Sequence, residues 1–177
     1  MTSKSSATTY FVELTLRQNG NVVDRNVYWE STYPDEVHWT ATMNGENAGT
    51  TATMTQYADL QALNTLASAT VTASNVTTAG VAGPDGADTV TDVTLTNTSA
   101  KTVGFFLRTD LRRGNASGVP QSGDNEVASA LWSTNDVTLF PGESETVSVT
   151  YKATDLDGTT PVIGLSGWNV AAQDVVA

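Results

Sequence analysis

The stretch Leu131–Ser144 reads LWSTNDVTLFPGES, and the chain continues through Thr146–Tyr151 as TVSVTY. Its first part is typical of a strand, Pro141-Gly142 of a tight turn, and the continuation of a returning strand. In the returning strand the apolar residues share one face and the hydroxyl residues the other: Val147, Val149 and Tyr151 against Thr146, Ser148 and Thr150. A half-buried antiparallel strand requires this period of two residues. The stretch therefore predicts two strands of a β-sandwich.

Similar segments recur from Ser68 onward, and turn signals separate them. The predicted strands are residues 69–73, 89–97, 103–111, 127–139, 143–152 and 161–170, with Val93 and Leu95 facing inward. A turn is expected at 80–87, a polar loop at 112–125 and a tail at 172–177. Short strands at this spacing are typical of immunoglobulin-like folds. The predicted fold class is therefore all-β, with an immunoglobulin-like antiparallel β-sandwich over residues 68–171.

An additional N-terminal β-hairpin precedes the sandwich. Residues 10–16 and 22–29 have the pattern of two strands, and the Asn19-Gly20 pair between them is a turn signal. An isolated hairpin is at best marginally stable in water, so residues 1–32 are expected to pack against something else. Residues 33–67 show no sustained period and are expected to form a linker or extended loop, with one short helical turn at Tyr57–Leu63.

The net charge argues against several classes of partner. The chain has 177 residues, and 19 acidic residues against 8 basic ones give a formal net charge of −11. Nucleic acids and anionic membrane surfaces attract clustered Lys and Arg, so neither is an expected partner. A polycation such as chitosan, the polymer of glucosamine, would be attracted at low salt; alternatively, the scattered acidity only supports solubility.

The chain has no cysteine, which excludes disulfides, zinc-thiolate sites and thiol chemistry. No apolar run approaches the ~20 residues of a membrane-spanning helix. Met1–Thr9 is polar and lacks the hydrophobic region of a signal peptide. If the domain is secreted, its signal is expected on a longer parent chain.

The sequence contains no evident catalytic constellation. Hydrolysis of a glycoside normally needs two carboxylates about 5–10 Å apart in a cleft, whereas acidic residues such as Asp35 and Asp92 fall in turns or on polar strand faces. His38 is the only histidine, so neither a Ser-His-Asp triad nor a multi-histidine metal site is expected. Residues 85–88 and 155–158 resemble fragments of calcium loops without the full pattern, and Asp-Gly turns are expected there. The sequence therefore predicts no catalytic residue, metal ligand or cofactor.

Aromatic side chains are candidates for stacking on sugar rings. Trp132 and Trp168 lie within strand patterns, so packing in the core or between domains is expected for them. Tyr33 and Trp39 lie in the segment expected to be irregular, and they are the candidates for carbohydrate contact.

Three tripeptides match the acceptor pattern for N-glycosylation. They are Asn75-Val76-Thr77, Asn97-Thr98-Ser99 and Asn115-Ala116-Ser117. In a chain rich in Thr and Ser such matches arise by chance, so the sequence alone assigns them no function.

Four pieces of the sequence share an order and spacing with a known enzyme family. The pieces are Tyr10–Leu16 with Arg25–Trp29, Gln56–Leu60, Leu131–Asn135 with Leu139–Ser144, and Val162–Val170. Together they resemble the C-terminal end of the glycoside hydrolase family 2 exo-β-D-glucosaminidases, which are relatives of β-mannosidases. The resemblance extends from about residue 10 to residue 171.

The resemblance implies a non-catalytic accessory role in a secreted bacterial enzyme. In such enzymes a jelly roll, an immunoglobulin-like domain and a catalytic (β/α)8 barrel precede two further immunoglobulin-like domains. By resemblance, the residues up to 32 correspond to the end of the first of these two immunoglobulin-like domains. Residues 33–67 correspond to the segment that connects it to the second domain, and residues 68–171 correspond to that second domain. The catalytic carboxylates belong to the barrel, so no residue here inherits them. The implied partners are the barrel and its neighbouring domains. The segment Asn44–Thr55 departs from the family pattern.

Two other functions remain open from the sequence. The chain could be an independent carbohydrate-binding or surface-adhesion β-sandwich. A self-contained glycosidase is the least favoured reading, since no acid pair is found. An exposed edge of the N-terminal hairpin would also allow the isolated chain to self-associate.

Overall fold

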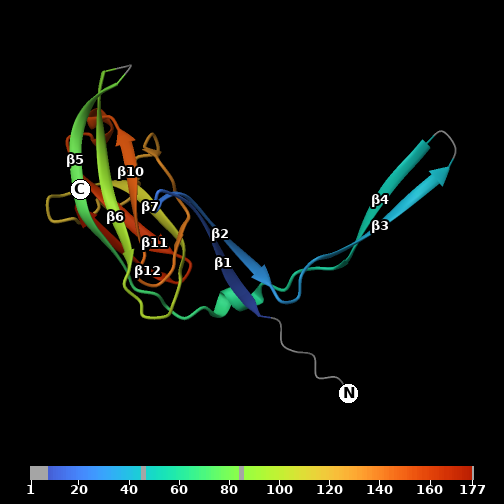
Figure 1. The fold of residues 1–177 in the computed structure, drawn as a ribbon. Coiled ribbons are helices and arrows are strands. Elements are labelled where there is room, and N and C mark those ends of the chain that lie inside the picture. The colour runs from blue at the N-terminus through green and yellow to red at the C-terminus, as the bar shows by residue number, and fades with distance from the viewer. Residues whose placement is uncertain (1–7, 45–46, 84–85, 177) are drawn as a thin grey trace. The chain divides into compact units, whose positions relative to one another are not determined.

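The computed structural model describes residues 8–44, 47–83 and 86–176. It divides into two units, one extending to Leu66 and the other beginning at Ala67. Strands dominate both units (Figure 1). The two short helices in the described ranges are the 3-10 helices η1 (Gln61–Thr65) and η2 (Ala153–Leu156). No helix within those ranges has the length and apolarity needed to cross a membrane.

The first unit contains the predicted N-terminal hairpin. Strands β1 (Thr9–Gln18) and β2 (Asn21–Ser31) pair antiparallel, with Phe11 opposite Trp29. Asn19 and Gly20 both have positive φ, 51° and 86°. Two consecutive positive φ values define the type I′ turn that a two-residue hairpin favours, so the Asn-Gly prediction is confirmed.

A second hairpin replaces the expected linker at residues 33–67. Strands β3 (Glu36–Asn44) and β4 (Asn47–Gln56) pair antiparallel, with Trp39 opposite Ala52. The expectation of an extended loop was therefore wrong for these residues. Thr and Ala fill most of both strands, so the alternation has low contrast in hydrophobicity, although Thr favours strands. Gly45 and Glu46, between the two strands, lie outside the described residues.

The base of the β3–β4 ribbon is fixed by hydrogen bonds to side chains. Ser31 Oγ donates to the carbonyl oxygen of Asp59 (2.7 Å) and accepts from the backbone N of Tyr33 (3.0 Å). Asp35 Oδ1 accepts from the backbone N of Ala58 (2.8 Å). These bonds join the segment before β3 to the segment after β4, so the ribbon has a defined base. The helical turn that follows, η1, lies slightly later than predicted.

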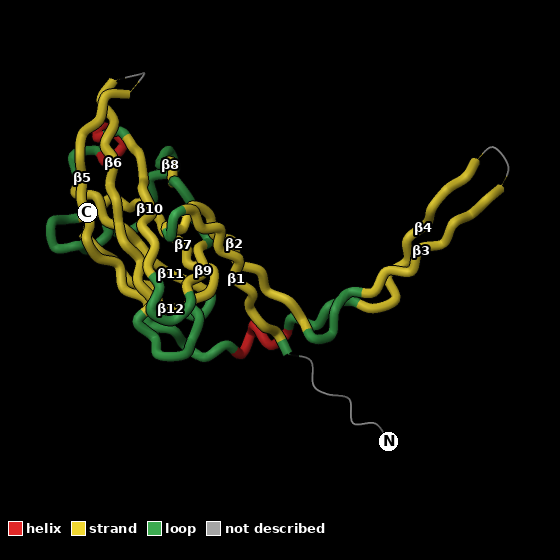
Figure 2. The backbone as a smooth tube through the Cα atoms, viewed as in Figure 1, coloured by secondary structure: helices red, strands yellow, loops and turns green. Residues whose placement is uncertain are grey.

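The second unit is a sandwich of two antiparallel sheets (Figures 1 and 2). One sheet has the order β5-β6-β10-β8, comprising β5 (Val71–Gly83), β6 (Gly86–Asn97), β10 (Ser144–Tyr151) and β8 (Leu131–Trp132). The other has the order β12-β11-β7-β9, comprising β12 (Val170–Val176), β11 (Thr160–Gly167), β7 (Gly104–Gly114) and β9 (Val137–Leu139). The predicted fold class, an immunoglobulin-like sandwich preceded by a hairpin, is confirmed.

The core lies between the two sheets and follows the period of two. Strands β6, β10 and β11 each contribute side chains that are fully buried or nearly so: Val93, Leu95, Val147, Val149, Ile163 and Leu165. Burying such a side chain contributes about 1.5–3 kcal/mol. On the outer face of the first sheet, hydroxyls pair across strands instead, as Thr94 and Thr146 do at 3.0 Å. The inward and outward faces predicted for β6 and β10 are therefore confirmed.

Three local predictions in the sandwich were wrong: the strand at 127–139, the turn at 80–87 and the tail at 172–177. The strand expected at 127–139 is two short strands, β8 and β9, separated by Ser133–Asp136. Asn135 explains the break, because its side-chain amide pairs with the backbone N and O of Thr109 (2.9 and 3.0 Å) in place of a strand residue. The expected turn at 80–87 is mostly strand, since β5 and β6 pair as far as Gly83 and Gly86. Pro84 and Asp85 lie outside the described residues.

The expected tail at 172–177 is instead the edge strand β12, described to Val176. It pairs with β11, with Val162 opposite Val176. Gln173 Nε2 also donates to the carbonyl oxygen of Val71 (2.7 Å). The tail was missed because Ala171, Ala172 and Gln173 carry no clear alternation. The sandwich therefore extends beyond the predicted limit at residue 171.

Candidate functional site

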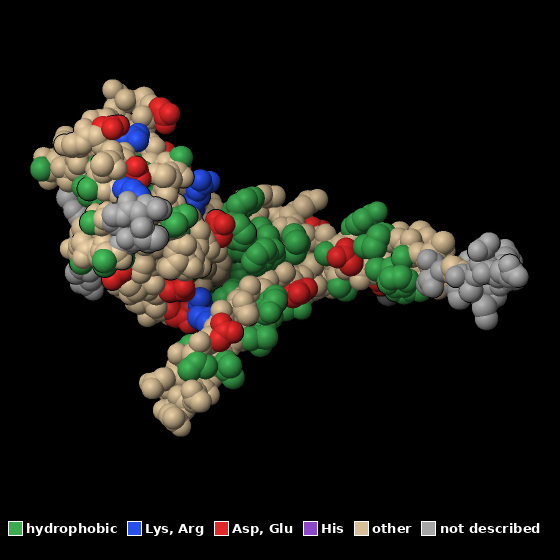
Figure 3. All heavy atoms as spheres, turned by 90° about the horizontal axis from the view of Figure 1, so that it is seen from above, with side chains coloured by type: hydrophobic (Ala, Val, Ile, Leu, Met, Phe, Trp, Pro, Cys, Tyr) green, Lys and Arg blue, Asp and Glu red, His purple; other side chains and the backbone are tan. Residues whose placement is uncertain are grey.

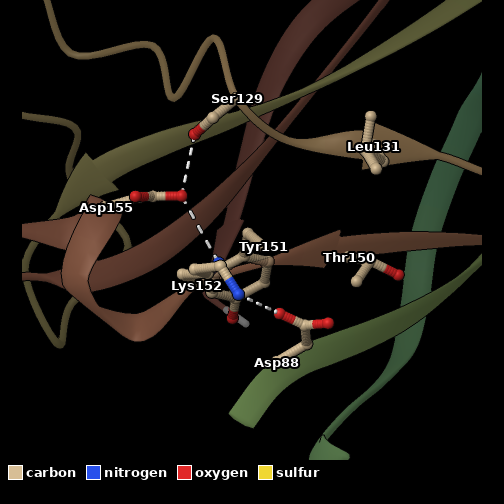
Figure 4. Close-up of a pocket in the computed structure, with 7 residues that line it drawn as sticks. All are labelled: Asp88, Ser129, Leu131, Thr150, Tyr151, Lys152 and Asp155. Atoms are coloured by element: carbon tan, nitrogen blue, oxygen red, sulfur yellow. Dashed lines mark hydrogen bonds and ion pairs between the residues drawn. The ribbon is translucent and has the colours of Figure 1, made fainter. Parts of the chain in front are cut away.

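The second unit has a pocket of about 390 Å3 near the ends of β10 and β6. Its lining residues are Asp88, Ser129, Leu131, Thr150, Tyr151, Lys152 and Asp155. They come from the start of β6, the loop before β8, β8 itself, the end of β10 and helix η2 (Figure 4). This pocket brings together two carboxylates, an ammonium group and three hydroxyls.

The charged groups in the pocket pair with one another. Lys152 Nζ lies 2.9 Å from Asp88 Oδ1. Asp155 Oδ2 accepts from Ser129 Oγ (2.8 Å), and the close-up shows the two side chains directed toward each other (Figure 4). Each carboxylate therefore has a protein partner. A glycosidase would instead need two carboxylates directed at a bound sugar.

The tyrosine of the pocket belongs to the core. Tyr151 is 3% exposed, and its hydroxyl shares a buried hydrogen bond with Thr91 Oγ1 (3.1 Å). Thr91 Oγ1 is in turn 2.8 Å from Thr78 Oγ1. The phenol therefore connects β10 to β6 and β5 and is not presented to a ligand. These contacts give the pocket a structural role.

A second charged cluster lies on the other sheet. Arg112 forms an ion pair with Asp110 and another with Asp174, the latter at 3.0 Å. Gly164 is the register partner of both Asp110 on β7 and Asp174 on β12. The hydrogen bond with Asp110 is the main cause that raises the pKa of Arg112, while burial acts in the opposite direction. The cluster holds three strands together and keeps the guanidinium charged.

The described residues do not assemble a metal site. No group of three or more His, Asp or Glu side chains within residues 8–44, 47–83 and 86–176 could hold a metal ion. Residues 155–158 lie in η2 and an Asp-Gly turn, with Asp157 and Gly158 at φ 51° and 77°. That conformation is the turn expected from the sequence.

The two candidate carbohydrate contacts lie in different parts of the first unit. Trp39 is 67% exposed and lies in β3, opposite Ala52. Tyr33 is 43% exposed and lies at the base of the ribbon, where its backbone takes part in the hydrogen bonds described above. Because opposite residues share a face, Val37, Trp39, Ala52 and Met54 form one apolar face of the ribbon. Hydrophobic side chains are visible on this ribbon in the space-filling view (Figure 3).

The other two tryptophans expected to pack behave differently from each other. Trp132 is partly buried and packs against the core cluster, as expected. Trp168 is 58% exposed, because it lies in the turn between β11 and β12 and not within a strand. The rings of Trp168 and Phe105 form an edge-on pair, with centroids 6.2 Å apart. Only Trp132 therefore contributes to the core.

Sequence reasoning missed two asparagines that organise the sandwich. Asn97 is fully buried, and its Nδ2 donates to the carbonyl oxygens of Thr102 and Leu139, both at 2.8 Å. Asn169 Oδ1 accepts from the backbone N of Phe105 (2.9 Å), while its Nδ2 donates to Ala67 and Val103. An asparagine at the end of an alternating strand is the only signal the sequence offers. Both residues serve the scaffold.

Comparison with known proteins places this geometry in one family. Residues 50–170 match the family model described as the exo-beta-D-glucosaminidase Ig-fold domain. An exo-beta-D-glucosaminidase of Streptomyces avermitilis is 43% identical over 173 residues, which are 97% of this chain and 17% of that protein. The corresponding enzyme of Amycolatopsis orientalis is 37% identical over 172 residues, 97% of this chain and 15% of that protein. A fungal exo-beta-D-glucosaminidase, from Hypocrea jecorina, is 34% identical over 169 residues, 93% of this chain and 16% of that protein.

A solved structure agrees with the sequence comparison. The crystal structure of Amycolatopsis orientalis exo-chitosanase CsxA superposes with a TM-score of 0.71 at 36% identity, covering 96% of this chain and 18% of that chain. This chain therefore spans less than a fifth of the length of these relatives, and it corresponds to an immunoglobulin-fold part of them. The resemblance found in the sequence is confirmed. The chain belongs to the exo-beta-D-glucosaminidase Ig-fold domain family.

Proposed function

We propose that this chain is a non-catalytic accessory region of an exo-β-D-glucosaminidase-type glycoside hydrolase, and that it packs against and supports the catalytic barrel of that enzyme. The observation that carries the proposal is the family match over residues 50–170, in relatives of which the chain covers only 15–17%. A region that makes up so small a part of an enzyme, and has the fold of a sandwich, suits a supporting role.

The chemistry of the charged groups supports this role. Lys152 pairs with Asp88 in the pocket, and Arg112 pairs with Asp110 and Asp174 on the other sheet. Such internal pairs hold strands together and leave no carboxylate pair facing a bound sugar in the described pocket. Turnover by this chain alone is therefore not expected.

The first unit supplies the surface for packing. Tyr10, Leu14, Leu16 and Tyr28 are 45–62% exposed, and the β1–β2 register places them on one face. A two-stranded ribbon with an apolar face is marginal in water and is stabilised by burial against another layer. The proposed layer is a neighbouring domain of the parent enzyme. In this proposal residues 1–32 complete a preceding immunoglobulin-like domain, and the sandwich from residue 68 onward is a separate domain.

The proposed location is outside the cell, as part of the parent enzyme. One relative is named an exo-chitosanase, and chitosan is a polymer that is degraded where it is encountered, outside the cell. The absence of cysteine is compatible with secretion by a bacterium that does not use disulfides. Detection of the parent enzyme in culture medium, with a cytoplasmic marker retained in the cells, would test this location.

A domain exchange tests the accessory role. The corresponding segment of the Amycolatopsis orientalis enzyme is replaced by this chain, and a matched variant lacks the segment altogether. The exchange is expected to remain soluble and to hydrolyse p-nitrophenyl β-D-glucosaminide, whereas the deletion loses soluble activity. Hydrolysis by the purified chain alone would overturn the proposal, as would full activity of the deletion.

One observation favours a second candidate, an independent carbohydrate-binding sandwich. Trp39 is 67% exposed on the apolar face of a ribbon with a defined base, and Tyr33 lies at that base. Aromatic faces of this kind stack on sugar rings. Titration of the chain with glucosamine oligosaccharides distinguishes the two. Millimolar or tighter binding that is lost in Trp39→Ala and kept in Trp168→Ala would favour the second candidate, and no binding would favour the first.

A further inference from the structure

The three glycosylation tripeptides occupy different environments in the structure. Asn97 is fully buried, and both Nδ2 hydrogens are directed at carbonyl oxygens 2.8 Å away. Asn115 is exposed, in the loop that follows β7. The side chain of Asn75 lies outside the described part of the structure. Position therefore separates Asn97 from Asn115, which the sequence pattern could not do.

The local geometry at Asn115 leaves its amide nitrogen available. Asn115 Oδ1 accepts from the backbone N of Ser117 (2.9 Å) and of Val119 (3.2 Å), which is an Asx turn. The backbone of the same residue is held by Val119 and Gly118, through bonds of 3.0 Å each. Among the described residues, none accepts a hydrogen bond from Asn115 Nδ2. The oxygen is thus used by the fold, whereas the nitrogen of this exposed side chain is not.

The loop can carry a large substituent without disturbing the core. Ala116 and Ser117 are exposed as well, and Val119 is 55% exposed. A glycan on Nδ2 would project into solvent and keep the Asx turn, because the turn uses only Oδ1. A glycan on Asn97 Nδ2 would replace one of the two hydrogens that donate to carbonyl oxygens, and it could not fit inside the sandwich. Glycosylation of the folded chain is therefore compatible with one of these two positions only.

From this geometry we propose that Asn115 is an N-glycosylation site. In the reaction, Asn115 Nδ2 attacks the anomeric carbon of a lipid-pyrophosphate-linked oligosaccharide, supplied with its oligosaccharyltransferase by the producing cell. A C–N bond forms, the bond between that carbon and the pyrophosphate oxygen breaks, and its electron pair leaves with the lipid pyrophosphate. The amide proton passes to a base of the transferase. The Ser117 hydroxyl is the third residue of the acceptor pattern. This site is independent of the accessory role proposed above.

The test is secretion of the full chain from yeast, followed by peptide mass mapping. The expected result is a glycan on the peptide that contains Asn115 and none on the peptide that contains Asn97. Ser117→Ala should abolish the modification and leave the fold intact, since Ser117 contributes its backbone N to the turn, whereas Ser117→Thr should keep it. Asn115→Gln should also remove the glycan, with circular dichroism showing that the variant still folds.

Three results would overturn the site. The first is an unmodified Asn115 in folded secreted chain, while a reporter glycoprotein secreted by the same cells is fully modified. The second is a glycan on Asn97 in chain that shows the wild-type unfolding transition, because burial would then not discriminate between the positions. A modification at Asn115 that survives Ser117→Ala would equally contradict the proposal.

Discussion

Asn97 Nδ2 donates a hydrogen bond of 2.8 Å to the carbonyl oxygen of Leu139, and this bond links the end of β6 in one sheet to β9 in the other. The chain has no cysteine, so the disulfide that joins the sheets of antibody domains is absent and apolar packing must replace it. The structure adds a polar link to that packing. Asn97 is fully buried and also bonds to Thr102, so its amide closes the turn between β6 and β7 as well.

The first prediction is that Asn97→Ala lowers the free energy of unfolding by at least about 2 kcal/mol. The substitution leaves the carbonyl oxygens of Thr102 and Leu139 without their partner, and each unsatisfied buried group costs about 1–3 kcal/mol. Urea denaturation measures the change. Thr94→Ala, which removes a solvent-side hydroxyl pair, is the control and should cost less than about 0.5 kcal/mol. Equal effects in the two variants would contradict the role of Asn97.

The second prediction concerns the apolar core. Leu95→Ala should lower the free energy of unfolding by about 2–5 kcal/mol, because Leu95 is fully buried and the loss leaves a cavity. Leu131→Ala is the matched control: Leu131 is 72% exposed, so its truncation should be nearly neutral. If thermal denaturation shows comparable losses for both leucines, the assignment of inward and outward faces is incorrect.

The core strands and the β3–β4 ribbon illustrate how far the sequence could predict the fold. Leu95, Val147 and Val149 were predicted to face inward because apolar and hydroxyl residues alternate strongly in their strands, and burial is what that alternation encodes. The β3–β4 ribbon was missed because Ala and Thr differ too little in hydrophobicity to reveal the same period. A strand could therefore be predicted where the alternating residues differed strongly in hydrophobicity, and it was missed where they did not.

The functional candidates were harder to predict than the strands. The family resemblance depends on the spacing of four sequence pieces, which survives in the linear chain. The role of Asn97 depends on Leu139, which is 42 residues away, and no local pattern encodes that contact. The environment of Asn115 likewise appears only when the loop after β7 is formed. Contacts of this kind require the topology.

The third prediction concerns Gly164. A Cβ atom at this position would lie 2.9 Å from both Cζ and Nη2 of Arg112, so the guanidinium would have to move away from Asp110 and Asp174. Gly164→Ala should therefore lower the free energy of unfolding by about 1–3 kcal/mol. Gly123→Ala is not a suitable control because its φ is positive, whereas Gly80 has open space and an ordinary φ. Denaturation with guanidinium chloride measures both variants, and Gly80→Ala should be close to neutral.

The fourth prediction is that the contribution of Arg112 does not change with pH in the neutral and mildly alkaline range. Asp110 raises the pKa of Arg112 in the folded chain, so its stabilising contribution is fully present below the unfolded pKa and is lost only as pH rises through the still higher folded value. The difference in unfolding free energy between wild type and Arg112→Met should therefore be constant from about pH 6 to about pH 9. A difference that shrinks steadily over this range would show that another titrating group controls the cluster.

The fifth prediction is that the isolated chain self-associates through the apolar face of β1–β2. Leu14 and Leu16 are 56% and 62% exposed, and unpaired ribbons with such faces tend to associate. Sedimentation velocity should show dimers or larger species at micromolar concentration, together with binding of a hydrophobic dye. The double variant Leu14→Lys and Leu16→Lys should shift the chain toward monomer and reduce dye binding. The control is Val119→Lys, which replaces an exposed apolar residue of the sandwich and should have neither effect. A strictly monomeric wild type that binds no dye would mean that the chain covers this face by itself, and the need for a neighbouring domain would disappear.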